Sequence, residues 1–218
     1  HAVGAVYRNS DPSDIVVTAA GGLVGEVVQV WKPKQLNTFE TEWGFSCMGY
    51  EISGALGIKM AKPDQDVVVF VGDGSYLLNN TDIYSSVIYD QKLIIIVCDN
   101  GGHMVINRLQ LAKGGKEYIC NLRAARATNL KFVDFENHAK SMGANAETVS
   151  STSELEAAYK RAKDSDKTYV ITIKTHGYEW LEGTAFWESP TLQDPITDNN
   201  KSALEDFESG KSKQRKGV

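Results

Sequence analysis

Two short runs of β-branched and aliphatic residues, each followed directly by small polar residues, constrain the fold of this chain more than any other feature. Residues 67–71 lead into Gly72-Asp73-Gly74-Ser75, and residues 93–98 lead into Asp99-Asn100. Such runs are typical of strands buried on both faces of a parallel sheet. The 24 residues that separate the Gly-Asp-Gly motif from Asp99 suffice for a crossover helix and a second strand. We therefore predict two neighbouring parallel strands.

The carboxyl ends of neighbouring parallel strands meet at one edge of a sheet, where open α/β sheets bind ligands. The pattern thus predicts that the Asp73 carboxylate and the Asn100 carboxamide lie together, beside glycines. Oxygen ligands next to exposed backbone N–H groups suit a magnesium ion that holds a diphosphate. Either motif alone is typical of a turn, but their shared position after two strands favours a site. The pair Asn79-Asn80 is not a second candidate for the asparagine of this site, because it follows Gly74 too closely for a second strand to lie between them. It instead predicts the start of a helix.

Strand and helix patterns alternate along the chain, which predicts an α/β fold with a doubly wound parallel sheet and helices on both faces. The expected strands are residues 15–19, 67–71, 93–98, 146–149 and 169–174, and residues 36–39 are expected to be a short extended piece. The expected helices are residues 20–31, 50–61, 81–89, 132–142 and 153–163.

This alternation defines one domain over residues 15–180. Residues 1–14 are expected to be a lead-in or linker from a missing N-terminal part, because the chain opens without a methionine, as an excised fragment does. Residues 181–218 are polar and are expected to be a partly disordered extension without a packed core. Residues 101–130 have no clear period and contain four glycines, so we expect a long loop without regular structure that forms a mobile cover over the site.

Composition excludes several classes of function. The net charge of −5 gives no basic surface for nucleic acid, and no apolar run approaches the length of a membrane span. The three cysteines are odd in number and lack the spacing of a metal site, so they predict reduced thiols in a cytoplasmic protein.

The Gly-Asp-Gly motif followed at this separation by Asp99-Asn100 resembles the binding motif of thiamine-diphosphate-dependent enzymes, in which Gly-Asp-Gly is followed by Asn-Asn. Asp99 is a departure, since the family has asparagine there. The resemblance implies thiamine diphosphate and Mg²⁺ as cofactors. It also implies that the metal ligands are the Asp73 carboxylate, the Asn100 carboxamide and the Gly102 carbonyl.

Residues 44–49, Gly-Phe-Ser-Cys-Met-Gly, resemble the segment beneath the cofactor in decarboxylases and acetolactate synthases. This implies that Met48 wedges the cofactor into a bent shape and that the Ser46 carbonyl accepts from its 4′-amino group. His176, just past the last strand, is a candidate substrate contact. The remaining expected cofactor contacts are Gly21, Gly22, Gly72, Gly74, Ser75, His103 and Met104.

Within this superfamily, residues 42–51, 72–75, 99–110 and 176–179 resemble the trihydroxycyclohexanedione hydrolases of inositol breakdown. The resemblance extends over roughly residues 10–180, whereas the residues just before Glu42 and residues 113–126 depart from it. It implies hydrolysis of a C–C bond that opens a cyclic 1,2-diketone, 3D-(3,5/4)-trihydroxycyclohexane-1,2-dione, to 5-deoxyglucuronate.

In the superfamily, the glutamate that activates the cofactor lies on a separate pyrimidine-binding domain of the same or a partner subunit. Glu26, Glu42 and Glu51 are not expected to replace it, and Glu51 is predicted to face away from the site. The resemblance therefore implies the diphosphate-binding half of a homodimeric or homotetrameric enzyme, inactive alone on its diketone substrate.

Other functions stay open at this point. One is a different thiamine-diphosphate enzyme, such as an acetolactate synthase-like enzyme or a 2-oxo acid decarboxylase. Another is an oxidoreductase β-subunit with an iron–sulfur cluster, which the three scattered cysteines disfavour. The last is a non-catalytic phosphate- or nucleotide-binding module, although Gly-Xaa-Gly-Xaa-Xaa-Gly does not follow the first strand.

Overall fold

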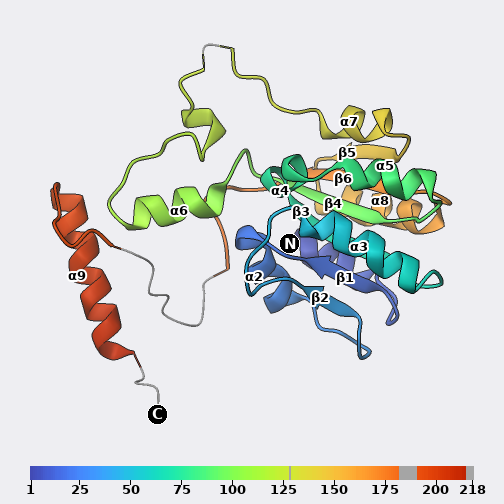
Figure 1. The fold of residues 1–218 in the computed structure, drawn as a ribbon, viewed down its shortest axis with the longest axis horizontal. Coiled ribbons are helices and arrows are strands. Elements are labelled where there is room, and N and C mark those ends of the chain that lie inside the picture. The colour runs from blue at the N-terminus through green and yellow to red at the C-terminus, as the bar shows by residue number, and fades with distance from the viewer. Residues whose placement is uncertain (128, 182–190, 215–218) are drawn as a thin grey trace.

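A fully parallel sheet forms the centre of the structure, a computed structural model that describes residues 1–127, 129–181 and 191–214 (Figure 1). Its strands lie in the order β2-β1-β3-β4-β6-β5. Their bounds are β1 (Ile15–Thr18), β2 (Phe39–Thr41), β3 (Val67–Gly72), β4 (Ile94–Asp99), β5 (Asn145–Val149) and β6 (Tyr169–Lys174). This is the predicted doubly wound α/β sheet, and the five predicted strands are present within one residue of their expected bounds. The sixth strand, β2, begins at the last residue of the short extended piece expected at 36–39.

Helices cover both faces of the sheet (Figure 1). One face packs against α1 (Ala2–Arg8), α2 (Gly21–Val30) and α8 (Thr152–Asp164). The other packs against α3 (Tyr50–Ala61), α4 (Asp73–Leu78), α5 (Thr81–Ile88) and α7 (Phe135–Ser141). The remaining helices are α6 (Met104–Ala112), the 3₁₀ helix η1 (Leu122–Ala124) and α9 (Asp198–Lys213). No helix in the described part of the chain is long and apolar enough to cross a membrane.

The central strand β3 shows why these residues form a sheet with two buried faces. Val68 and Phe70 point into the core shared with α1, α2 and α8, whereas Val67, Val69 and Val71 point into the opposite core. All five side chains are fully buried. A continuous apolar run satisfies both faces at once, which a strand of alternating polarity cannot do.

The connections reverse direction at β1, because β2 lies on one side of this strand and β3 on the other. The first crossover, α2, covers one face of the sheet, and the next, α3, covers the other. The loops that follow β1 and β3 therefore diverge at the carboxyl end of the sheet. Ligands of open α/β folds bind at such switch points.

Two helices at the ends of the chain are absent from the sequence predictions. α1 lies in the expected lead-in, and its Val3 and Val6 are buried in the core beside α8. α9 lies in the polar extension, where Ala203 is buried and the Asn200 amide donates to the Lys113 carbonyl at 3.1 Å. The local sequence of neither segment clearly indicates a helix. Tertiary contacts stabilise such helices more than intrinsic helix propensity does. The disorder expected at 182–190 and 215–218 concerns residues outside the described ranges.

The expectation that residues 101–130 lack regular structure is wrong, since α6 and η1 lie within them. The apolar side chains of α6 do not form one buried stripe: Met104 and Asn107 are buried, whereas Ile106 and Leu111 are exposed. The usual sign of an amphipathic helix is therefore missing. Mobility of this segment stays a prediction.

A cluster of charged side chains joins the start of β1 to α8 at the amino end of the sheet. The Lys163 ammonium lies 2.8 Å from the buried Asp14 carboxylate and 2.7 Å from the exposed Asp11 carboxylate. The Tyr159 hydroxyl donates to Asp14 at 3.0 Å. This cluster is remote from the strand ends that follow Gly72 and Asp99, so it serves stability.

We expect Asp14→Ala to lower the free energy of unfolding by about 3 kcal/mol or more, because it leaves a buried tyrosine hydroxyl and a half-buried ammonium without their shared acceptor. Asp11→Ala is the matched control. It removes a carboxylate that contacts the same lysine but is 67% exposed, and the expected cost is below about 1 kcal/mol. Urea unfolding measures both, and equal losses would contradict the structural role assigned to Asp14.

Candidate functional site

Asp73 and Asn100 lie together at the carboxyl end of the sheet. The register pairs Gly72 of β3 with Cys98 of β4, so Asp73 and Asp99 are the next residues on adjacent strands. Asp73 then begins α4, and its Oδ2 accepts a hydrogen bond from the Gly102 N–H at 2.7 Å. The pairing of two strands thus brings together residues that are far apart in the sequence.

Three polar groups from these loops converge on one point. One terminal amide atom of Asn100 lies 3.2 Å from Asp73 Oδ1 and 2.9 Å from the Gly102 carbonyl oxygen. As nitrogen, this atom donates to both oxygens. Turning the amide over puts the carboxamide oxygen there without changing the shape of the side chain. In the second orientation, three oxygens face one another at distances that suit neighbouring ligands of a small cation.

Burial and a neighbouring charge shape the electrostatics of this cluster. Burial raises the pKa of the Asp73 carboxyl group above its ordinary value, and the negative charge of Asp99 raises it further. Asp99 is itself buried, forms an ion pair with Lys174 of β6 and accepts from the Gly101 N–H at 3.0 Å. A cation beside Asp73 would offset the cost of its buried charge.

Glycines let side chains from distant loops approach the same backbone. A Cβ atom at Gly74 would lie 2.6 Å from His103 Nδ1 and 3.4 Å from Met48 Cε. A Cβ at Gly22 would lie 3.7 Å from the Cβ of Val105, near the start of α6. The structure therefore brings the predicted cofactor contacts Gly22, Gly74, Met48 and His103 into two adjoining groups around α4 and α6.

The segment that carries Met48 is exposed and is held by an acidic side chain. The Glu42 carboxylate accepts from the N–H groups of Phe45 at 3.0 Å and Cys47 at 2.6 Å. These hydrogen bonds hold the pKa of Glu42 below its ordinary value. Ser46, between the two donors, has a left-handed φ of 52°, which is uncommon for a residue other than glycine.

The other predicted site residues differ in their surroundings. Ser75 and Met104 are buried, and a Cβ at Gly177 would lie 2.8 Å from Met104 Cε. Gly21, which has a φ of 77°, starts α2 directly after β1 and lies near Val105. His176 is exposed and contacts Tyr178 and Glu179 rather than the oxygen cluster. Its role in substrate contact stays a prediction.

Glu51 is the site residue whose position the sequence analysis predicted wrongly. Its side chain is 1% exposed and faces the loops at the carboxyl end of the sheet instead of pointing away. It accepts hydrogen bonds from the N–H groups of Gly49 at 2.9 Å and Ala20 at 3.3 Å. Burial raises the pKa of this carboxyl group above its ordinary value.

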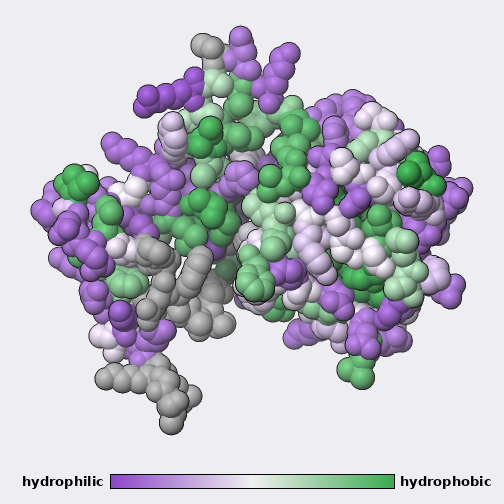
Figure 2. All heavy atoms as spheres, in the orientation of Figure 1, coloured by the Kyte–Doolittle hydropathy of each residue, from purple (hydrophilic) through white to green (hydrophobic). Residues whose placement is uncertain are grey.

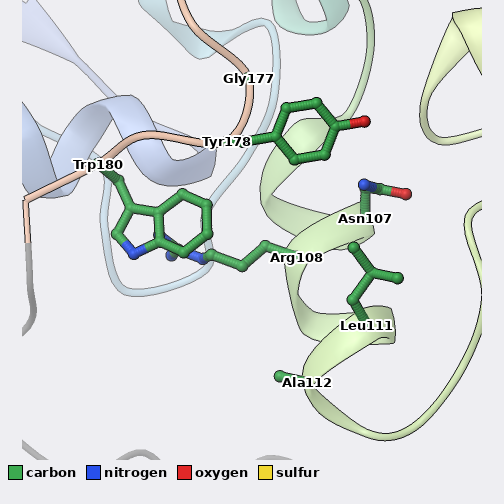
Figure 3. Close-up of a pocket in the computed structure, with 7 residues that line it drawn as sticks. All are labelled: Asn107, Arg108, Leu111, Ala112, Gly177, Tyr178 and Trp180. Atoms are coloured by element: carbon green, nitrogen blue, oxygen red, sulfur yellow. The ribbon is translucent and has the colours of Figure 1, made fainter.

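A pocket of about 350 Å³ lies between α6 and the segment after β6 (Figure 3). The Arg108 guanidinium stacks over the Trp180 ring, 4.4 Å from its centre. None of the residues in the oxygen cluster lines this pocket. The lining residues are Asn107, Arg108, Leu111, Ala112, Gly177, Tyr178 and Trp180.

The chemistry of these groups limits what they can hold. In the described ranges, no group of three or more histidine, cysteine, aspartate and glutamate side chains is placed to hold a metal ion. The oxygen cluster is of another type, since it combines one carboxylate with a carboxamide and a main-chain carbonyl. This donor set fits Mg²⁺, which prefers oxygen ligands and shares its shell with water and phosphate.

Large hydrophobic side chains are exposed around the site. Trp43, Phe45 and Met48 are exposed in the segment after β2, as are Ile106 and Leu111 on α6. Figure 2 shows hydrophobic residues at the surface between α6 and the sheet. Exposed apolar side chains therefore lie beside the site.

A doubly wound sheet with glycine turns and oxygen ligands at its strand ends defines a phosphate-binding α/β domain. Residues 19–173 match the family described as thiamine pyrophosphate enzyme, C-terminal TPP binding domain, and the chain belongs to this family.

Two curated relatives of the chain carry the same name. The chain is 38% identical over 180 residues to a 3D-(3,5/4)-trihydroxycyclohexane-1,2-dione hydrolase of Halalkalibacterium halodurans, a match that covers 80% of this chain and 28% of that protein. It is 37% identical over 217 residues to the protein of the same name from Lacticaseibacillus casei, covering 96% and 33%. The chain therefore spans about a third of the length of these relatives.

Solved structures share the fold. A thiamine diphosphate-dependent 4-hydroxybenzoylformate decarboxylase of Rhodococcus jostii superposes with a TM-score of 0.66 at 20% identity, over 80% of this chain and 32% of that one. A benzoylformate decarboxylase of Polynucleobacter necessarius gives a TM-score of 0.66 at 23% identity, over 83% and 33%. At these identities the likeness establishes the fold alone.

We expect Gly102→Ala to lower the free energy of unfolding by more than about 1 kcal/mol, because the backbone φ of 137° suits glycine and a Cβ would lie 2.4 Å from the Cys120 carbonyl oxygen. Gly25→Ala is the control. Apart from the chain around Gly25 itself, no atom of the described residues lies within 4 Å of a Cβ there, so the substitution is expected to stabilise α2 by up to about 1 kcal/mol. Chemical denaturation measures both. A Gly102→Ala variant as stable as the parent would show that the loop geometry is wrong.

Proposed function

We propose that this chain is the diphosphate- and magnesium-binding part of a thiamine-diphosphate-dependent hydrolase that opens a cyclic 1,2-diketone by cleaving a C–C bond. The observation that carries the proposal is the convergence of Asp73 Oδ1, the Asn100 amide and the Gly102 carbonyl. Octahedral Mg²⁺ with oxygen ligands at about 2.1 Å places neighbouring ligands about 3 Å apart. The observed separations of 3.2 and 2.9 Å suit that spacing.

In this proposal, Asp73, Asn100 and the Gly102 carbonyl supply three ligands, and diphosphate oxygens and water complete the shell. The backbone of Gly74 and the turn at Gly21 and Gly22 lie where main-chain N–H groups can bind diphosphate oxygens. Ser75, His103 and Met104 border the same position, and His176 is the candidate substrate contact. The cofactor, when bound, supplies the carbanion chemistry of the reaction.

Met48 supports the bent shape of the cofactor in this proposal, and the Ser46 carbonyl accepts from its 4′-amino group. Glu42 fixes the backbone of this segment through the N–H groups of Phe45 and Cys47. Such support matters because a cofactor must be held close to its reactive geometry. The exposed position of Met48 leaves its side chain accessible to a ligand.

The proposed substrate, 3D-(3,5/4)-trihydroxycyclohexane-1,2-dione, is taken from the name of these relatives and would place the reaction in inositol catabolism. The remaining parts of the site belong to a pyrimidine-binding domain of the same or a partner subunit in a cytoplasmic homodimer or homotetramer. The apolar surface at Trp43 and Phe45 supports such a covering domain, because exposed hydrophobic side chains commonly mark interfaces.

Binding of the cofactor can be tested on this chain directly. We expect thiamine diphosphate with Mg²⁺ to raise the melting temperature by a few degrees, and NAD or ATP with Mg²⁺ to leave it unchanged. Chelation of the metal should remove the shift. Asp73→Asn should also remove it, because the neutral amide lacks the charge that attracts the cation.

Asp166→Asn is the matched control, since it neutralises an exposed carboxylate outside the site and should keep the full shift. An equal response to ATP would favour a general nucleotide-binding module. A shift that persists in Asp73→Asn would contradict the proposed ligand set.

Activity is expected only when the rest of the enzyme is supplied. The chain alone should not open the diketone, because no glutamate of the described part is proposed to activate the cofactor. Adding a chain that carries the pyrimidine-binding domain should restore ring opening, and Asp73→Asn should fail under the same conditions. Product analysis with the diketone and with 2-oxo acids separates a hydrolase from a decarboxylase. Cofactor-dependent turnover by this chain alone would reveal a catalytic glutamate within it.

A further inference from the structure

Glu51 is a buried acid that accepts hydrogen bonds from main-chain N–H groups. It is 1% exposed and accepts hydrogen bonds from the N–H groups of Gly49 and Ala20, and the neighbouring Ser75 side chain opposes the upward shift of its pKa. A carboxyl group in such a place is costly, which is consistent with the upward shift of its pKa. An apolar side chain at the start of α3 would avoid that cost.

Ala20, Gly49 and Ser75 lie on three separate segments at the carboxyl end of the sheet. Ala20 ends the connection after β1 and precedes the turn at Gly21 and Gly22. Gly49 follows Met48 and precedes α3 with a left-handed φ of 96°. Ser75 belongs to α4, directly after the Asp73-Gly74 pair. One side chain therefore connects three of the segments that border the proposed cofactor site.

We infer that Glu51 is a positioning residue that fixes the glycine turn after β1, the Met48 segment and the start of α4 relative to one another. This inference rests on the proposed function, because the three segments matter together only if they bind one ligand. Glu51 reaches the backbone and the Ser75 hydroxyl, so it acts through these segments and not by contact with the reacting atoms. It is thus distinct from the activating glutamate of the proposed partner domain.

The glycine at position 49 supports this role. A Cβ there would lie 2.8 Å from the Cβ of Asn79, so α3 and the end of α4 are in close contact at this point. The Gly49 N–H points to the Glu51 carboxylate in the backbone conformation that glycine favours. Glu51 consequently holds the Met48 segment by its last N–H group, while Glu42 holds its middle.

The test compares Glu51→Gln and Glu51→Leu with the parent chain at a temperature at which all are folded. The measured quantities are the dissociation constant for thiamine diphosphate with Mg²⁺ and the amide hydrogen exchange of residues 20–22 and 47–49 without ligand. We expect binding to weaken about tenfold in Glu51→Gln, and more in Glu51→Leu, because hydrogen bonds to a charged acceptor are lost. Exchange should accelerate in both segments.

Lys59→Met is the matched control. Lys59 is a buried charged residue on the same helix, but its ammonium donates to the carbonyls of Pro63 and Gln65 at the other end of the sheet. This variant should lower the melting temperature without changing ligand binding or exchange in the two segments.

Unchanged affinity and unchanged exchange in both Glu51 variants would overturn the inference. Equal effects in Lys59→Met would also overturn it, because the cause would then be the stability of α3. If the parent chain fails to bind thiamine diphosphate, the proposed function fails. The exchange comparison needs no cofactor and would still decide whether Glu51 holds the glycine turn after β1 and the Met48 segment in place.

Discussion

The parallel pairing of β3 with β4 is the interaction on which the candidate site depends. It aligns Gly72 with Cys98, so that Asp73 and the Asp99-Asn100 pair leave the sheet side by side. Both strands are apolar on both faces, and the two cores hold their register because a slip by one residue would exchange the faces of every side chain. Two glycines in unusual conformations then turn the chain after Asn100, which lets the Gly102 carbonyl reach the same point.

This arrangement places two carboxylates in a buried setting, and the neighbouring strand reduces the resulting repulsion. Lys174 ends β6 in register with Asp99 of β4 and pairs with its carboxylate. Asp73 receives the Gly102 N–H on one oxygen and directs the other towards Asn100. Asp99 is the departure from the family motif, and the ion pair with Lys174 offsets its buried negative charge within the sheet. The geometry at Asn100 is retained.

Most of the sheet and the meeting of Asp73 with Asn100 were predictable from the sequence, because apolar runs mark buried strands and topology brings their ends together. The Gly102 carbonyl was expected only from the resemblance to the thiamine-diphosphate motif. The position of Glu51 was not, although a signal existed. Ile52, Ala55 and Leu56 form the buried stripe of α3, and Glu51 and Lys59 lie at the two ends of the same face. Charged residues at such positions resemble a solvent-exposed edge unless their backbone partners are known. Helix α6 was not predicted because its apolar residues do not form one buried stripe: some of them, such as Ile106 and Leu111, are exposed.

The two ends of the sheet differ in how far their costly groups are stabilised within the chain itself. At the amino end, the Lys163 ammonium and the Tyr159 hydroxyl satisfy the buried Asp14, and this network needs no ligand. At the carboxyl end, Ser46 has a left-handed backbone, Glu51 is a buried acid and the segment around Met48 exposes hydrophobic surface. Each of these features costs free energy in the isolated chain. Because sites tolerate such costs where binding offsets them, the carboxyl end is where a ligand and a covering domain would contribute most to the stability of the fold.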